Sequence, residues 1–304
     1  DNQGEQEHNE TDRSVATKKR KLAKEPLRIG LLGCGEINSK VAEMIVKKEA
    51  GPAELVAVLV RKERTHNELQ ELLPPECRTE ATVVTANADD FFSMSSNWSL
   101  CVEAAGQPAV RLYGKRCLEI GRDLMITSIG SLTSDDLYDE LQKTAEANGS
   151  RLILCTGSLP AVDWMGSAAL DSCEEVKVTQ VKPPKAWLGT PAEADHPDLL
   201  KIIEPRTLFE GSARKAATLF PKNANVAAML ALATSGLDKT LARLVADPNV
   251  TANRVELSFL GAAGKIKVQV EAAPSKTNPR TSAIVSLSVV KAIKKLCSPI
   301  IVGL

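Results

Sequence analysis

The chain has 304 residues, which is enough for two domains with hydrophobic cores of their own. Hydrophobic residues make up 43% and charged residues 25%, as is typical of a globular protein, and 38 basic residues balance 38 acidic ones. A neutral chain with 3% aromatic residues favours neither nucleic acid nor an anionic membrane as a partner. No apolar run reaches the roughly 18 residues that span a bilayer. These properties leave small molecules as the expected ligands.

The first 25 residues differ from the rest of the chain. They are polar and charged and have no periodic apolar pattern, which predicts disorder. The basic run 18–21 has the composition of a nuclear-import signal, although a solvated charged tail is the simpler interpretation. Beyond this tail, seven cysteines stand singly and form no CxxC pair. This pattern predicts reduced thiols, no metal site and a cytoplasmic location.

Apolar strands and amphipathic helices alternate from Pro26 onward. The strands are expected at residues 27–32, 55–60, 82–85, 99–104, 123–128 and 151–155, and the helices at 37–46, 63–73, 109–120 and 133–148. Buried strands that are each followed by a helix predict a parallel sheet with right-handed crossovers. We therefore expect a Rossmann-type domain over residues 26–157.

The second half has a different pattern. Strands are expected at residues 176–181, 240–246, 254–260 and 265–271, with a hairpin turn at 261–264 and a helix at 225–236, whereas the stretch 182–206 is rich in Pro, Gly and acidic residues. This mixture predicts an α+β domain over residues 158–274. A last helix over 282–297 is expected to return residues 275–304 to the first domain.

The turn from the first strand to the first helix carries a dinucleotide-binding pattern. Gly33 allows a tight turn, and Gly35 lets a pyrophosphate approach the backbone. The helix that starts at Glu36 and Ile37 then offers free N–H groups and the positive end of its dipole. Asn38 replaces the third glycine of the fingerprint, which weakens the match.

The end of the second strand favours NADP over NAD. A site that prefers NAD places a carboxylate here to bind the ribose 2′-hydroxyl, and Val60 cannot do so. Arg61 and Lys62 can instead hold a 2′-phosphate through charge-assisted hydrogen bonds. The alternative is a solvated basic loop, with NAD as the cofactor.

Ten segments together resemble the L-aspartate dehydrogenases. In chain order they are Gly33–Gly35, Val102–Val110, Tyr113–Gly114, Asp123–Met125, Thr156–Leu159, Lys182–Pro184, Phe209–Ala213, Phe220–Ala228, Ala246–Pro248 and Asn278–Ser282. The resemblance extends over nearly everything from Arg28 onward. The Phe-Pro-x-Asn-x-Asn-Val-Ala-Ala segment is the most specific of the ten.

This resemblance implies a function. In that family, L-aspartate is oxidatively deaminated with NAD(P), or the reverse amination takes place. The resemblance places Ser158 and Asn225 at the nicotinamide end of the cofactor, and Ala105 is counted with the cofactor-binding residues. The expected substrate is an amino acid or its imine, and we expect a homodimer.

The chain departs from the family at the catalytic histidine, which the resemblance implies in an Asn-x-His segment. Here Asn253 is followed by Arg254 and Val255, and valine can neither take nor give a proton.

Other residues are considered for the role of this histidine. Lys182 is expected to bind a substrate carboxylate or act as a base, unless it is only a solvated strand-end lysine. Asn253 either orients substrate or satisfies a strand end. His196, Asp163 and Asp247 are explained more simply as a surface residue, a helix cap or dipole partner, and a turn residue.

Two functions follow from these observations. The first is an NAD(P)-dependent oxidoreductase that acts on a C–N bond. Within it, imine reduction fits the loss of histidine better than deamination does, because it needs no activated water. The alternative is a catalytically silent NADP-binding sensor or scaffold.

Overall fold

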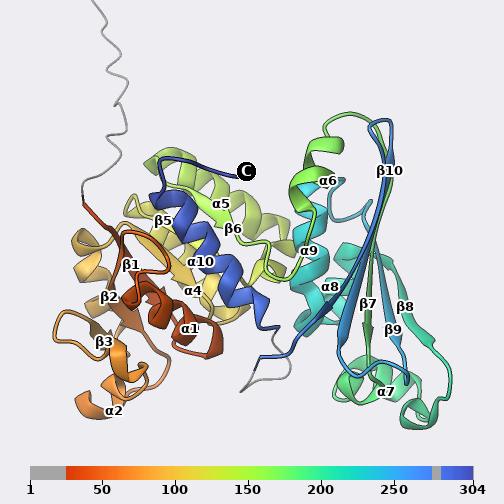
Figure 1. Ribbon diagram of the computed structural model, residues 1–304, viewed down its shortest axis with the longest axis horizontal. Helices are drawn as coiled ribbons and strands as arrows, with labels where there is room; N and C mark the ends of the chain where they lie inside the picture. Colours follow the sequence, from red (N-terminus) through yellow and green to blue (C-terminus); the bar gives the residue numbers. More distant parts are fainter. Residues whose placement is uncertain (1–24, 276–281, 304) are drawn as a thin grey trace, which may run out of the picture.

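The computed structural model describes residues 25–275 and 282–303, so most of the N-terminal tail with its basic run lies outside the described residues. Two sheets stand side by side, and helices lie between and around them (Figure 1). The first sheet has the strand order β3-β2-β1-β4-β5-β6, and all of its pairings are parallel. The second has the order β11-β10-β7-β9-β8 and mixes parallel with antiparallel pairs. The predicted fold class is confirmed.

The strands differ between the sheets in length and burial. In the first sheet they are β1 (Leu27–Leu32), β2 (Ala53–Leu59), β3 (Val83–Thr85), β4 (Leu100–Glu103), β5 (Asp123–Ile126) and β6 (Leu152–Leu154). In the second they are β7 (Cys173–Lys182), β8 (Arg206–Ser212), β9 (Leu241–Ala246), β10 (Asn253–Gly261) and β11 (Gly264–Ala272). The central strands of the first sheet are buried along most of their length because helices cover both faces. Strand β11 alternates half-buried and exposed residues, as a strand with one solvent-facing side does.

Ten α-helices complete the described fold. They are α1 (Glu36–Val46), α2 (His66–Gln70), α3 (Ala88–Ser93), α4 (Gln107–Glu119), α5 (Asp135–Asn148), α6 (Val162–Ala168), α7 (Pro191–Asp195), α8 (Ala213–Leu219), α9 (Ala224–Ala233) and α10 (Ile284–Cys297). Helices α6, α8 and α9 lie between the two sheets (Figure 1). Helix α10 returns to the first sheet, where Val289, Val290 and Ile293 share a core with Ile29 and Val41.

Two expectations about elements are wrong, and one strand is missed. The helix expected over residues 63–73 is limited to α2, because Thr65 caps its start by accepting a hydrogen bond from the Glu68 N–H. The helix expected over 225–236 ends three residues early, where Gly236 takes a positive φ and donates to the Ala231 carbonyl. Strand β8, over Arg206–Ser212, is absent from the expected elements.

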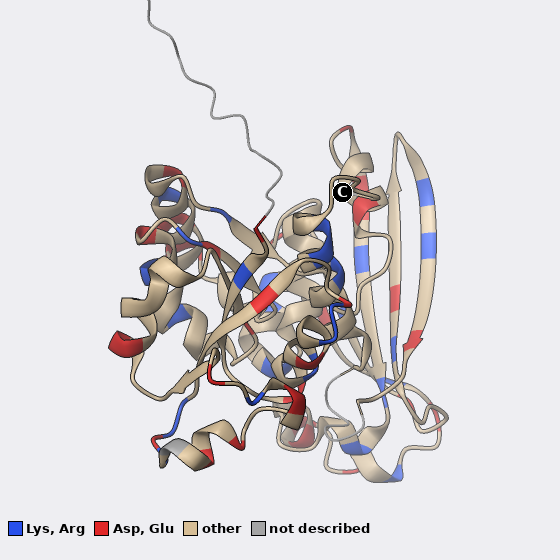
Figure 2. Ribbon diagram, turned by 60° about the vertical axis from the view of Figure 1, so that its left-hand side comes forward, with Lys and Arg blue, Asp and Glu red and all other residues tan. Residues whose placement is uncertain are grey.

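The two faces of the second sheet are unequal. The inner face packs against α8 and α9, and Val178, Leu257 and Phe259 are buried there. Figure 2 shows Lys, Arg, Asp and Glu along the strands of this sheet, on the right of the view. Lys177 pairs there with Glu210 at 2.6 Å across the strands. The inner face therefore carries the apolar packing.

Within residues 25–275 and 282–303, no helix has the length and hydropathy to cross a membrane, and no group of three or more His, Cys, Asp or Glu side chains is placed to hold a metal ion. All seven cysteines lie in these ranges and are free thiols.

Candidate functional site

The turn from β1 to α1 has the geometry that the two glycines predict. Gly33 has φ +87°, and a Cβ built on it would lie 2.8 Å from the Cβ of Ala105. Gly35 is the N-cap of α1, and a Cβ built there would meet nothing within 4 Å. The first is thus required by the fold, whereas the second faces open space at a helix N-terminus. Open space beside free N–H groups, including those of half-buried Glu36 and Ile37, fits a pyrophosphate.

Asn38 stabilises this turn from inside. Its side chain is fully buried, and Nδ2 donates to the carbonyl oxygens of Leu32 and Gly33, both at 2.9 Å. A third contact of 3.4 Å reaches the Val102 carbonyl on β4. The amide therefore holds the ends of β1 and β4 together, which explains how the chain keeps the turn without the third glycine.

Glu103 is a buried carboxylate beside the glycine turn, and the sequence alone does not single it out. This last residue of β4 is fully buried, and its Oε1 accepts hydrogen bonds from the N–H groups of Ala105 at 2.7 Å and Gly106 at 2.8 Å. Ser128, after β5, adds bonds from its hydroxyl at 2.8 Å and its N–H at 3.2 Å. Burial raises the pKa of Glu103, and these hydrogen bonds oppose that rise. The carboxyl group thereby fixes the loop that carries Ala105.

Arg61 and Lys62 lie just beyond the end of β2, beside the strand that carries the glycine turn. They follow β2, whose last residue Leu59 pairs with Leu32 of β1 and accepts a hydrogen bond from the Gly33 N–H at 2.7 Å. Both basic side chains are exposed, and neither has an ion-pair partner among the described residues. They are therefore available to an anionic ligand at the edge of the sheet that carries the glycine turn.

Lys182 is the half-buried cation at the end of β7. Its Nζ donates to Oδ1 of Asn223 and lies 5.2 Å from the centre of the Trp187 ring. Burial lowers its pKa from 10.5 to about 8. Gln180, two residues earlier on the same face, donates to the Asn223 carbonyl oxygen at 3.0 Å. The expectation of a solvated lysine does not describe this environment.

Val255 lies on the same face of the sheet as this lysine. It pairs with Gln180 across β10 and β7, is 7% exposed and belongs to the apolar core. Asn253 begins β10, is half-buried and pairs with Ala272 of β11. The valine therefore brings no proton-transfer group to the position where the family resemblance implies histidine.

Asn225 joins the two sheets. In the first turn of α9, its Oδ1 accepts a hydrogen bond of 2.9 Å from the N–H of Gly130, in the turn Ile129–Thr133 that follows β5. Gln107, at the start of α4, donates to the Pro221 carbonyl oxygen at 3.1 Å. Ser158 is half-buried in the loop between β6 and α6. The segment before α9 is therefore tied to the carboxyl end of the first sheet.

The remaining candidates have ordinary positions. Asp163 lies in the first turn of α6, two residues past the N-cap Ala161, so it is not the helix cap and its carboxylate is placed to interact with the helix dipole. Asp247 accepts from the Asn249 N–H at 2.8 Å, as a turn residue does. His196 follows α7 and is half-buried, and His66 is the first residue of α2. His8 lies outside the described residues.

Comparisons with known proteins agree with this geometry. The family described as "Homoserine dehydrogenase, NAD binding domain" matches residues 33–154, and "Aspartate dehydrogenase, C-terminal" matches residues 163–296. The L-aspartate dehydrogenase of Methanosarcina barkeri is 35% identical over 278 residues, which cover 91% of this chain and 99% of that protein. That of Pseudomonas aeruginosa is 36% identical over 267 residues, with 88% and 96% covered. The crystal structure of aspartate dehydrogenase from Thermotoga maritima has a TM-score of 0.71 at 23% identity, covering 91% and 99%, and shares the fold.

The two glycines of the turn give a paired prediction. Gly33→Ala introduces a clash and an unfavourable φ, and we expect it to lower the free energy of unfolding by about 1–3 kcal/mol. Gly35→Ala should lower that free energy by less than about 1 kcal/mol, the cost of a poorer N-cap, yet weaken NADPH binding because its methyl group enters the space for the pyrophosphate. Denaturant unfolding and titration calorimetry measure the two effects. Equal NADPH affinities of Gly35→Ala and the wild type would contradict the assignment.

Proposed function

The chain belongs to the L-aspartate dehydrogenase family and is an NAD(P)-dependent oxidoreductase, and we propose that it acts on the C–N bond of an amino acid or its imine. The observation that carries this proposal is Lys182, a half-buried cation with no carboxylate partner among the described residues. An ammonium group held without a counter-ion suits a substrate that brings its own carboxylate. L-Aspartate and its imine are substrates of this kind.

The residues divide into a cofactor set and a substrate set. The bound dinucleotide accepts or supplies the hydride. In the proposal, the β1–α1 turn holds its pyrophosphate, Ala105 contacts the cofactor, and Ser158 and Asn225 bind its nicotinamide end. Lys182 binds the substrate carboxylate, and Asn253, at the start of β10, orients the rest of the substrate. The hydrogen bonds of Asn225 to Gly130 and of Asn223 to the β7 side chains support this division. They place the start of α9 between the loops of the first sheet and the end of β7, where the two sets would meet.

Imine reduction is the second candidate, and Val255 is the observation that favours it. Deamination passes through an imine whose hydrolysis needs a water molecule activated by a base. Reduction of a C=N bond needs one hydride and one proton, and it needs no activated water. A buried valine on the inner face of β10 is compatible with the second reaction and removes a presumed base of the first.

We also propose the organisation in which the site works. Residues 26–157, with 275–304, form the dinucleotide-binding domain, and residues 158–274 form the substrate domain. The cofactor is NADP in preference to NAD, supported by the unpaired Arg61 and Lys62. A homodimer is supported by the outer face of the second sheet, which no described helix covers in Figure 1.

Cofactor preference is tested at Arg61. We expect Arg61→Ala to weaken NADPH binding by roughly one to two decades, the usual worth of a charged hydrogen bond, and to leave NADH binding nearly unchanged. Lys265→Ala, an exposed lysine on distant β11, is the matched control and should change neither affinity. Titration calorimetry measures both cofactors. Equal losses for NADPH and NADH in Arg61→Ala would refute the 2′-phosphate assignment.

The charge of Lys182 gives a pH dependence. If the ammonium form binds a substrate carboxylate, kcat/KM falls as pH rises through about 8, where the amine loses its proton. Lys182→Arg should remove this fall, and Lys182→Met should lower kcat/KM by roughly ten- to hundredfold. Because the pKa is lowered on folding, the lysine also destabilises the fold below about pH 8. Stability should increase as pH rises from about 8 toward 10.5, and Lys182→Met should not show this increase.

Lys185, an exposed lysine three residues after Lys182, supplies the control for these measurements. Lys185→Met should keep both the wild-type pH profile and its kcat/KM. A wild-type kcat/KM that rises through pH 8 would show that Lys182 works as a base, against its proposed role.

The position of the missing histidine is tested by restoring it. Val255→His should gain aspartate-dependent NADP reduction, because positioned acid–base groups contribute roughly 10²- to 10⁴-fold in rate. The gain should increase through about pH 6–7, near the ordinary pKa of histidine. Overpacking is expected to lower stability by about 1–3 kcal/mol. Val255→Asn is the control, since it adds polarity without a titrating proton. A folded, NADPH-binding Val255→His variant no faster than Val255→Asn would refute this role.

A further inference from the structure

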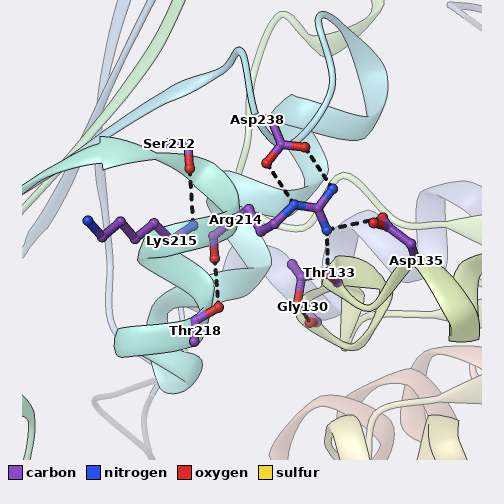
Figure 3. Close-up of polar contacts among 8 residues, drawn as sticks. All are labelled: Gly130, Thr133, Asp135, Ser212, Arg214, Lys215, Thr218 and Asp238. Atoms are coloured by element: carbon purple, nitrogen blue, oxygen red, sulfur yellow. Dashed lines mark hydrogen bonds and ion pairs between the residues drawn. The ribbon is translucent and has the colours of Figure 1, made fainter.

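Arg214 connects three parts of the molecule (Figure 3). It is the second residue of α8, and its Nε and Nη2 donate to the two carboxylate oxygens of Asp238 at 2.7 and 2.9 Å. Its Nη1 donates to the Thr133 carbonyl oxygen at 2.9 Å and to Asp135 at 3.0 Å. One guanidinium thus joins α8, the loop after α9 and the end of the turn Ile129–Thr133, which belongs to the first sheet.

Hydrogen bonds connect the turn that Arg214 holds to the side chain of Asn225. The Thr133 hydroxyl donates to the Gly130 carbonyl oxygen at 2.8 Å, and the Gly130 N–H donates to Asn225 Oδ1 at 2.9 Å. Gly130 is tightly packed, since a Cβ built there would lie 2.5 Å from Nε2 of Gln107 and 2.7 Å from the Cβ of Ala224. A displacement of the turn therefore moves the start of α9 with it.

We propose that Arg214 is a positioning residue for the reaction: it holds the turn Ile129–Thr133 so that Gly130 orients the side chain of Asn225. Because Oδ1 of Asn225 is occupied by the Gly130 N–H, its Nδ2 is the group left to donate to a ligand. The inference rests on the proposed function, in which Asn225 binds the nicotinamide end of the cofactor.

The arrangement requires arginine. Nε and Nη2 of the planar guanidinium donate two parallel hydrogen bonds to Asp238, while Nη1 donates to Thr133 and Asp135. Lysine keeps the charge but has three donors on a single nitrogen, so it cannot make the same set of contacts. Lys215, the next residue, extends away from this cluster in Figure 3 and has no ion-pair partner among the described side chains. Arg214→Lys therefore keeps the positive charge and removes the guanidinium geometry, whereas Lys215→Ala removes a neighbouring charge and leaves that geometry in place.

Hydrogen exchange tests the structural part of the proposal without requiring turnover. Arg214→Lys should speed exchange of the Gly130 amide by about tenfold, whereas Lys215→Ala should match the wild type. Unchanged exchange in Arg214→Lys overturns the proposal. Should that variant fail to fold, Asp135→Ala removes one exposed partner of Arg214, and a smaller increase at Gly130 is expected. No increase in Asp135→Ala would overturn the proposal equally.

Kinetics and NADPH binding test the positioning role. Arg214→Lys should lower kcat by roughly ten- to hundredfold, the usual effect of a small misplacement, while the Kd for NADPH changes less than about threefold. An unchanged kcat per folded molecule overturns the role. If the wild type has no turnover, the proposed function fails separately, and the emission of bound NADPH replaces kcat. Altered emission in Arg214→Lys at unchanged Kd supports the role, and unaltered emission overturns it.

Discussion

The short segment from Pro221 to Asn225 is the constraint on which the candidate site depends. Gln107 and Gly130 of the first sheet's loops bind it at Pro221 and Asn225. From the other side, Gln180 and Lys182 of β7 bind Asn223 between them. In the proposed function, the glycine turn holds the cofactor and Lys182 holds the substrate, so the two ligands can meet only if the two sheets are fixed relative to each other. Five residues before and within the first turn of α9 do so with hydrogen bonds from both directions.

The same segment supplies the hydrogen-bond acceptor, Asn223, for the half-buried ammonium group of Lys182. Among the described residues, the charge of Lys182 is met by an amide oxygen and the face of an indole ring, and burial lowers its pKa to about 8. This position lowers the stability of the folded state, because the charged form of the lysine is poorly solvated there. Strained, incompletely paired charges are common where a ligand supplies the missing partner. In the proposed function, the substrate carboxylate would supply the partner that this buried charge lacks.

How much of this the sequence predicts depends on how local each feature is. The turn at Gly33 is predictable, since a positive φ at a strand–helix junction is a backbone requirement that only glycine meets easily. The resemblance to L-aspartate dehydrogenases is confirmed by relatives that match along about nine tenths of the chain. Strand β8 is not predictable, because Arg206–Ser212 has neither an apolar run nor a clear alternation and is defined by pairing with β9. Glu103 is missed because its donors, from Ala105 to Ser128, come together only in the fold.

The central claim is that this chain reacts at a C–N bond with a nicotinamide cofactor, and one measurement tests it most directly. NADPH oxidation is followed by absorbance with oxaloacetate and other 2-oxo acids in the presence of ammonia, and separately with preformed cyclic imines. The account predicts turnover with one of these C=N substrates, and turnover restricted to preformed imines would identify the reaction as imine reduction. Tight NADPH binding without turnover on any of them would contradict the account and leave a dinucleotide-binding protein without this chemistry.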